Sequence, residues 1–330
     1  MDPVSINCTF LITDIFYINN LMQKDYFSCI LRTKTMVSRS RGQMLTETTN
    51  TWLKRGFLLY AHQGGALDAP ASTLFAMEQA LQSGANGIEL DVHRTRDGVL
   101  VVSHDPVVDT TTNGSGAIAD LDYEYISRLN NAYYFTEETP SSPESYPYRD
   151  IGANNPKFSV ARLEEVLSCF PDVVLNLDIK QTFPAVTPYE EQLALMLRHY
   201  GRQENTIVAS FHDKAIERFS EVAPEFATAP GAAEMAMYGK AFFGGTAISK
   251  SITRHVALQV PAKVGSMDII SKSFVETAHE LGLAIHVWTI NDEKTALELL
   301  DTKVDAIMTD RPKALANIDK LKSLLDTSSR

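Results

Sequence analysis

The sequence has few cysteines, no excess of basic residues and little that suggests a membrane protein. Three cysteines, Cys8, Cys29 and Cys169, are present among 330 residues, and their spacing matches neither a disulfide framework nor a cysteine metal site. Lysine and arginine number 30 against 41 aspartates and glutamates, which gives a formal net charge of −11. Because proteins that bind nucleic acid normally present a basic face, we expect no nucleic-acid partner.

An apolar stretch at residues 8–22 (CTFLITDIFYINNLM) raises the question of a targeting segment. Asp14 interrupts the stretch, no basic region precedes it, and no small-residue cleavage site follows it. It is also too short for an ordinary membrane span, so we expect no stable membrane insertion and, by default, a cytoplasmic protein. Residues 1–55 are assigned to an N-terminal extension of unknown structure.

Residues 56–330 alternate short apolar runs with segments of helical periodicity, which predicts a parallel sheet. Strands alternating with helices over this length favour an α/β fold, a (β/α)8 TIM barrel, with a doubly wound open sheet as the alternative. A loop-rich insertion is expected after the second strand, at about 110–158, and Ser72 is expected to cap the helix at 72–84. The eight predicted strands are FLLYA (57–61), GIELDV (87–92), DVVLNLDI (172–179), TIVASF (206–211), EFATA (225–229), VALQV (256–260), LAIHVWTI (283–290) and VDAIMTD (304–310), and a final helix is predicted at 312–325.

Acidic residues stand at the ends of two of these strands, where a TIM barrel has its active site. Glu89 and Asp91 are two residues apart on one strand, so their side chains share a face, and Asp178 ends the next predicted strand. Three carboxylates that face one another would repel, and an all-oxygen ligand set suits Mg²⁺ or Ca²⁺. The alternative is that these are solvated acids at strand ends.

Other polar residues also follow predicted strands. His62 and His104 could act as general acid and base near neutral pH, although packed or surface histidines are the more common case. His93, His212 and His286 also lie near strand ends, so position alone does not separate them from the first two. Lys180 could hold a phosphate oxygen or be a surface lysine, and Trp288 could form an apolar wall or belong to the core.

The segments AHQGG, IELDVHRTRDGVLVVSHD, LNLDIK, HVWTIND and VDAIMTDRP, taken in this order, resemble the motifs of the glycerophosphodiester phosphodiesterase family. The resemblance runs from about Phe57 to the C-terminal helix and implies a TIM barrel with an insertion after the second strand. It also implies site roles: a catalytic pair, a divalent metal site and contacts to the phosphodiester. The residues concerned are His62 and His104 for catalysis, Glu89, Asp91 and Asp178 for the metal, and Gln63, Lys180 and Trp288 for the substrate.

The sequence departs from the family pattern at three places. Gln63 stands where an arginine is usual, so another cation, Arg94 or Lys180, would have to supply the charge that binds phosphate. Asp178 replaces a glutamate, which a hard cation tolerates. Residues 70–73 read PAST instead of P-E-N-T, which removes a carboxylate near the expected site.

By the resemblance, the chain is expected to be a metal-dependent phosphoric diester hydrolase. It would cleave glycerophosphodiesters to glycerol phosphate and an alcohol, with the acid and base roles of the two histidines left open. One alternative is a lysophospholipase D that acts on lysolipids, with residues 131–135 (NAYYF) as a wall for the acyl chain. Another is a noncatalytic barrel that binds phosphoesters. The sequence leaves the oligomeric state undetermined.

Overall fold

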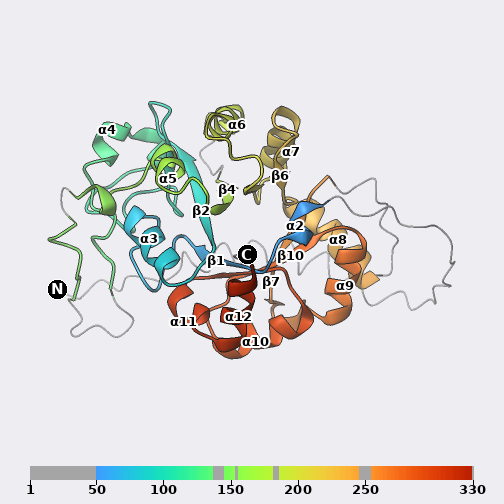
Figure 1. Ribbon diagram of the computed structural model, residues 1–330. Coiled ribbons are helices and arrows are strands. Elements are labelled where there is room, and N and C mark those ends of the chain that lie inside the picture. The colour runs from blue at the N-terminus through green and yellow to red at the C-terminus, as the bar shows by residue number, and fades with distance from the viewer. Residues whose placement is uncertain (1–49, 137–144, 153–154, 181–185, 245–253, 329–330) are drawn as a thin grey trace, which may run out of the picture.

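The computed structural model describes residues 50–136, 145–152, 155–180, 186–244 and 254–328. Parallel strands lie at the centre with helices outside them, which confirms the predicted TIM barrel (Figure 1). The strands follow the order β6-β5-β4-β2-β1-β11-β10-β7, and the two end strands approach through a 3.0 Å hydrogen bond from Val256 N to Thr228 O. The parallel strands are β1 Leu58–His62, β2 Gly87–Arg94, β4 Val174–Ile179, β5 Thr206–Ala209, β6 Ala227–Thr228, β7 Ala257–Pro261, β10 Ala284–Trp288 and β11 Ala306–Thr309.

Helices follow most strands and cover the outside of the barrel. Short pairs of antiparallel strands add to the rim: β3 (Leu100–Val102) pairs with β2, and β8 (Lys263–Val264) pairs with β9 (Met267–Asp268). The helices are α2 Thr51–Lys54, α3 Leu74–Gln82, α4 Tyr123–Ile126, α5 Leu163–Cys169, α6 Glu190–His199, α7 Asp213–Val222, α8 Ala232–Gly244, α9 Lys272–Glu280, α10 Glu293–Thr302, α11 Pro312–Ala316 and α12 Asp319–Ser328, with 3₁₀ turns at Ile118–Asp120 and Pro156–Phe158.

Two details of the helices differ from the prediction. The cap of α3 is Thr73, whose hydroxyl accepts a hydrogen bond from Ala76 N at 3.1 Å, because Ser72 has a left-handed backbone (φ 58°) and lies outside the cap position. The predicted final helix is two helices, α11 and α12. The side chain of Asn317 donates to Lys313 O at 2.7 Å, and this bond satisfies a terminal carbonyl where α11 ends.

Side chains alternate between the barrel interior and the layer under the helices, as expected for strands. Apolar residues, among them Tyr60, Ala257 and Ala306, fill the lower interior, while the adjacent residues of the same strands pack against helices. A Cβ atom at Gly87 would lie 2.6 Å from Cδ1 of Tyr60, so this glycine makes room for the tyrosine ring inside the barrel. The upper interior carries the polar side chains.

The end of the barrel opposite the polar side chains is closed by α2. Asn50 donates to Val256 O and Gly282 O, both at 2.7 Å, and Trp52 is buried beside the ring of His286 with centroids 6.2 Å apart. Residues 50–55, which the sequence assigned to the N-terminal extension, therefore belong to the barrel; the rest of that extension lies outside the described residues. Within the described residues, every helix is too short or too polar to cross a membrane.

Candidate active site

The predicted site residues come from strand ends that the barrel places side by side. His62, the last residue of β1, is the register partner of Glu89 on β2, and Asp91 on the same strand is the partner of Asp178 on β4. Because Glu89 and Asp91 differ by two positions, their side chains both point into the upper barrel. Parallel pairing thus brings the histidine and the three carboxylates to one end of the barrel.

Lys180 lies between two of the carboxylates. Its ammonium nitrogen is 3.1 Å from Asp91 Oδ1 and 3.3 Å from Asp178 Oδ2. Burial alone would lower the pKa of Lys180, but these two carboxylates raise it above the ordinary value. For the acid Asp91, burial has the opposite effect and would raise the pKa. The attraction of the Lys180 ammonium is stronger and holds the pKa of Asp91 below its ordinary value. A protonated lysine therefore stands at the site and partly neutralises the acidic cluster.

At Glu89 and Asp178 the effect of burial is stronger than the attraction of nearby cations, so the pKa of each carboxyl is raised. Burial, and then the neighbouring Asp91 carboxylate, raise the pKa of Glu89 to about 8. Burial also raises the pKa of Asp178, although Lys180 opposes it. Glu89 Oε2 accepts a hydrogen bond from Gln63 N at 3.1 Å. The raised pKa values show that the ionised forms of these carboxyls are costly in this buried place, so a further cation would stabilise them.

His62 is held by an aspartate from the other end of the sequence. Its Nδ1 lies 2.6 Å from Asp310 Oδ1, and Asn291 donates to the second oxygen of Asp310 at 2.7 Å. Burial would lower the pKa of His62, but Glu89 and Asp310 raise it to about 9. The hydrogen bond at Nδ1 leaves Nε2, which is 3.8 Å from Glu89 Oε2, as the nitrogen that faces the site.

His104 has a similar partner. Its Nδ1 lies 2.9 Å from Asp105 Oδ1, and this bond raises the pKa of the imidazole. The rings of His62 and His104 are 6.5 Å apart. His93 is also buried, with Nε2 3.4 Å from the carbonyl oxygen of His104, and burial lowers its pKa to about 4. Two aspartate-supported histidines thus stand near one another at the barrel mouth.

The residues expected to bind substrate differ in their placement. The left-handed backbone of Gln63 (φ 52°) turns the chain above Glu89, while Trp288 at the end of β10 meets the ring of Phe211 edge-on at 5.9 Å.

Arg94 was expected as a possible replacement for the missing arginine, and this prediction is wrong. As an even-numbered residue of β2 it projects away from Asp91, toward Gln192 of α6 at 3.4 Å.

Sequence reasoning missed four members of this cluster: Asp105, Phe211, Asn291 and Asp310. Three of them lie inside motifs that carried the family resemblance, so a signal was present for Asp105, Asn291 and Asp310. Their roles became visible only with the contacts to the two histidines. Phe211 ends the predicted strand at 206–211 and is 46% exposed, which a hydrophobicity pattern does not reveal.

The hydrogen bonding of the carboxylate oxygens shows whether the cluster fits a metal ion. In the part of the chain that the structure describes, no three His, Cys, Asp or Glu side chains form a ready-made metal site. However, Asp91 Oδ2 and Asp178 Oδ1 are buried without a hydrogen-bond partner among the described residues, which is costly for a carboxylate. An oxygen-only donor set of this kind fits Mg²⁺ or Ca²⁺. The metal site stays a prediction.

The sequence of this site matches a known family model. The model of the glycerophosphoryl diester phosphodiesterase family matches residues 62–314, from His62 to a point beyond Asp310. The chain belongs to this family. Membership makes the protein a phosphoric diester hydrolase, as the motifs implied. All the residues predicted for the site lie inside the matched range.

Individual relatives of this phosphodiesterase family align over nearly their whole length with about four fifths of this chain. A glycerophosphodiester phosphodiesterase of Caldanaerobacter subterraneus is 28% identical over 269 residues, which cover 79% of this chain and 97% of the relative. A crystal structure of an Agrobacterium tumefaciens glycerophosphodiester phosphodiesterase superposes with a TM-score of 0.61 at 26% identity, covering 79% and 100% of the two chains. An Oleispira antarctica phosphodiesterase, solved with its product sn-glycerol-3-phosphate, shares the fold (TM-score 0.58, 21% identity, 82% and 97% covered).

Proposed function

We propose that the protein hydrolyses glycerophosphodiesters, such as glycerophosphocholine, to glycerol phosphate and an alcohol, with His62 and His104 as proton carriers. The observation that carries this proposal is the pair of histidines, each bonded through Nδ1 to an aspartate, beside the buried acidic cluster. The product bound by the structurally similar Oleispira enzyme, sn-glycerol-3-phosphate, is the product expected of this reaction.

In the proposed reaction, the oxygen of a water molecule attacks phosphorus and the bond from phosphorus to the alcohol oxygen breaks. One histidine takes a proton from the attacking water, and the other donates a proton to the departing alcohol. The aspartate at each Nδ1 fixes the tautomer and leaves Nε2 for this transfer. Lys180 would hold a phosphate oxygen, with Gln63 and Trp288 as further contacts to the substrate.

Glu89, Asp91 and Asp178 would hold the divalent cation, Mg²⁺ or Ca²⁺. Bound there, it would polarise the phosphoryl oxygens and offset their negative charge. The two unpaired oxygens of Asp91 and Asp178 and the raised pKa of Glu89 support this assignment, since each reflects uncompensated negative charge in a buried place.

The test is choline release from glycerophosphocholine by the wild type and by His62→Ala, after chelation and after Mg²⁺ or Ca²⁺ is returned. We expect chelation to abolish turnover, one of the two cations to restore it, and the substitution to lower kcat by about 100-fold or more. His279→Ala, which removes a histidine–aspartate pair away from the site, is the matched control. Undiminished turnover by His62→Ala would refute the proposed role of this histidine.

A further inference from the structure

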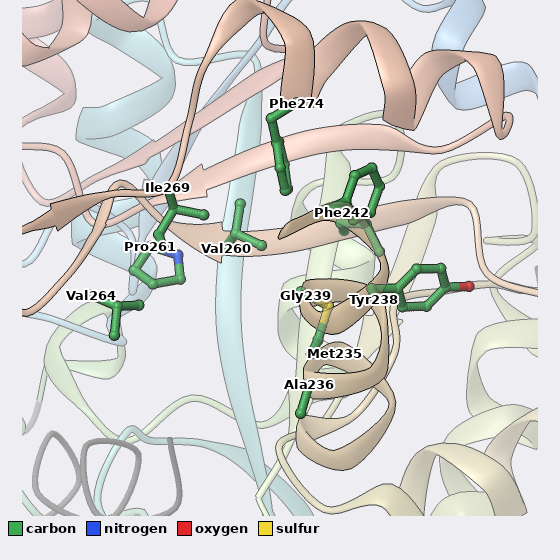
Figure 2. A pocket seen from close by; sticks show the side chains of 11 residues that line it. Met235, Ala236, Tyr238, Gly239, Phe242, Val260, Pro261, Val264, Ile269 and Phe274 are labelled. Carbon is green, nitrogen blue, oxygen red and sulfur yellow. The ribbon is translucent and has the colours of Figure 1, made fainter. Parts of the chain in front are cut away.

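The barrel meets its surroundings through apolar contacts in some places and through hydrogen bonds in others. Figure 2 shows the first kind between α8 and β7, where Met235, Val260 and Phe274 are among the apolar side chains that line a small cleft. Where the inserted segment at 110–158 meets the loops at the barrel mouth, partly buried groups form hydrogen bonds. A hydrogen bond fixes direction as well as distance, so contacts of this second kind can hold a loop in one position.

Asn131 joins three segments of the chain near the barrel mouth. Its Oδ1 accepts a hydrogen bond from Thr111 Oγ1 at 2.5 Å, and its Nδ2 donates to Ala71 O at 3.1 Å. Its backbone N donates to Phe158 O at 2.7 Å. Asn131 is 4% exposed, and a buried amide with an unpaired oxygen or nitrogen is costly, so this side chain is held in one orientation. The alternative role considered for residues 131–135, a wall for an acyl chain, does not suit this buried side chain.

The contact from Asn131 to Thr111 leads to His104. Two hydrogen bonds lower the pKa of the Asp105 carboxyl, one from His104 and one from the side chain of Thr110. Thr110 immediately precedes Thr111 in the chain, so the bond to the amide anchors the residue next to it. Anchoring this loop limits the movement of the carboxylate that supports His104.

The contact from the amide to Ala71 leads to His62. Ala71 precedes Ser72, whose backbone N donates to Gln63 O at 2.8 Å and so closes the loop that begins at the end of β1. Gln63 directly follows His62, and its own N donates to Glu89 Oε2 at 3.1 Å. The Ala71 carbonyl is thus linked through this loop to His62. One buried amide therefore contacts both of the loops that carry the proposed proton carriers.

The proposed reaction requires the two histidines to be held in a fixed relative position. Their ring centres are 6.5 Å apart, and one ring must reach the attacking water while the other reaches the departing oxygen on the opposite side of phosphorus. A displacement of about 1 Å in such a geometry costs about 100-fold in rate. Strand pairing places His62, the last residue of β1, but His104 lies two residues beyond the end of β3 at Val102. Contacts outside the sheet therefore have to place His104 relative to His62.

We infer that Asn131 is a positioning residue for the proposed hydrolysis: its amide, bonded to Thr111 and Ala71, sets the position of His104 relative to His62. It acts through the two loops and takes no proton itself. The inference rests on the proposed function, because it assigns both histidines to proton transfer. A variant that breaks this junction should slow the chemical step while substrate still binds, since the proposed phosphate and metal contacts stay in place.

The test uses Thr111→Val, which keeps the shape of the side chain but removes the hydroxyl that donates to Asn131. We expect kcat for choline release from glycerophosphocholine to fall by roughly 10- to 100-fold, with KM within about threefold of the wild-type value. Thr111→Ser restores the hydroxyl and should keep kcat within about twofold of the wild type. Asn131→Asp breaks the other contact, since a carboxylate cannot donate to Ala71 O, and should lower kcat to a similar extent.

A control separates positioning from a general loss of stability. Phe274→Leu reduces packing in the apolar cleft of Figure 2, outside both loops. Its urea midpoint should fall at least as far as that of Thr111→Val, while its kcat at 25 °C stays within about twofold of the wild type. A second measurement tests whether Thr111 acts through His104. In the His104→Ala background, Thr111→Val should cause no further loss of residual turnover, whereas independent structural effects would multiply.

The outcomes separate this inference from the proposed function. A kcat of Thr111→Val within about twofold of the wild type, or an equal loss in Thr111→Ser or Phe274→Leu, would overturn the inference and leave the proposed function standing. If Thr111→Val does not fold, Asn131→Asp decides, and unfolding of both variants would show a structural role in place of positioning. No turnover of glycerophosphocholine by the wild type would instead overturn the proposed function, and the inference with it.

Discussion

At the scale of single residues, the site depends on how two histidines are held. Each imidazole bonds through Nδ1 to a carboxylate, His62 to Asp310 and His104 to Asp105, so Nε2 of each is left for proton transfer. Asn291 holds the second oxygen of Asp310 and accepts a hydrogen bond from Asp310 N at 2.8 Å. Asp310 is therefore fixed on both sides and acts as a positioning residue for His62.

Asp310→Asn should lower kcat sharply while KM and stability change little. The amide can keep one hydrogen bond to Nδ1 but disfavours the tautomer and the imidazolium that the carboxylate stabilises, so we expect a loss of about 100-fold or more in kcat. Steady-state kinetics and a urea unfolding curve measure the two effects separately. Asp292→Asn, a nearby exposed aspartate that caps α10, is the control. A proportional loss of kcat and stability would indicate a merely structural role for Asp310.

At the scale of elements, the loop between β1 and α3 shapes the upper edge of the site. Gln63, Gly64 and Gly65 all have positive φ angles, and a Cβ atom at Gly65 would lie 2.8 Å from Cγ of Pro312. The loop then closes through Ser72 N, which donates to Gln63 O at 2.8 Å, immediately before α3 begins. The cap of α3 thus fixes the loop that places Gln63 N against Glu89.

Thr73→Ala should destabilise the fold by about 1–2 kcal/mol, because the Thr73 hydroxyl caps α3 and also donates to Pro70 O at 2.7 Å. The shift in the urea midpoint measures the loss. Ser72→Ala is the matched change at the neighbouring position, and it should cost less, since the buried Ser72 hydroxyl has no partner within the described residues. A larger loss for Ser72→Ala would show that Ser72 supports the helix after all.

At the scale of the whole molecule, the barrel has a polar upper interior and a largely apolar base. His286 lies in that base, fully buried between the rings of Trp52 and Tyr60, at 6.2 and 5.6 Å. Neither of its ring nitrogens has a hydrogen-bond partner among the described residues, and burial lowers its pKa to about 4. The folded protein therefore keeps this histidine neutral down to acidic pH.

The lowered pKa of His286 predicts a loss of stability in acid. Between pH 6.5 and about 4 the unfolded chain binds a proton at this histidine that the folded chain does not, so stability falls as the pH falls, by about 3 kcal/mol over the full window. His93, with its similarly lowered pKa, contributes in the same direction. The raised pKa of Glu89 acts in the opposite direction over the same pH range, so the contribution of His286 is measured by comparing urea unfolding of the wild type at pH 7 and pH 4.5 with that of a variant that lacks this histidine.

His286→Leu should remove the contribution of this residue and stabilise the protein at pH 7 by about 1 kcal/mol or more, because an apolar side chain of similar size replaces an unpaired polar one. The variant should also lose less stability than the wild type between pH 7 and pH 4.5. His199→Leu, exposed on α6, should leave the pH dependence unchanged. An unaltered acid sensitivity of His286→Leu would mean that other groups cause it.

The barrel, the family motifs and most residues of the candidate site could be predicted from the amino-acid sequence. Hydrophobic residues recur with different periods in strands and in helices, so the alternation of the two could be predicted from short stretches of sequence. The same pattern placed Glu89, Asp91 and Asp178 at strand ends, where a TIM barrel has its active site. Two helix boundaries differed from the prediction, at the cap Thr73 and at the break between α11 and α12, because several neighbouring residues could make the terminal hydrogen bonds.

The contacts between residues far apart in the sequence could not be predicted and became known from the fold. His62 and Asp310 are 248 positions apart and touch because β1 pairs with β11 as the barrel closes. Closure also faces Phe211 toward Trp288 and leaves the edge of β7 beside α8. Such contacts depend on strand register and on the order of strands around the barrel, and these are set by packing between elements. The hydrophobic period of a single strand does not specify them. The catalytic and metal-binding residues could therefore be predicted from the sequence, but the residues that position them, such as Asp310, could not.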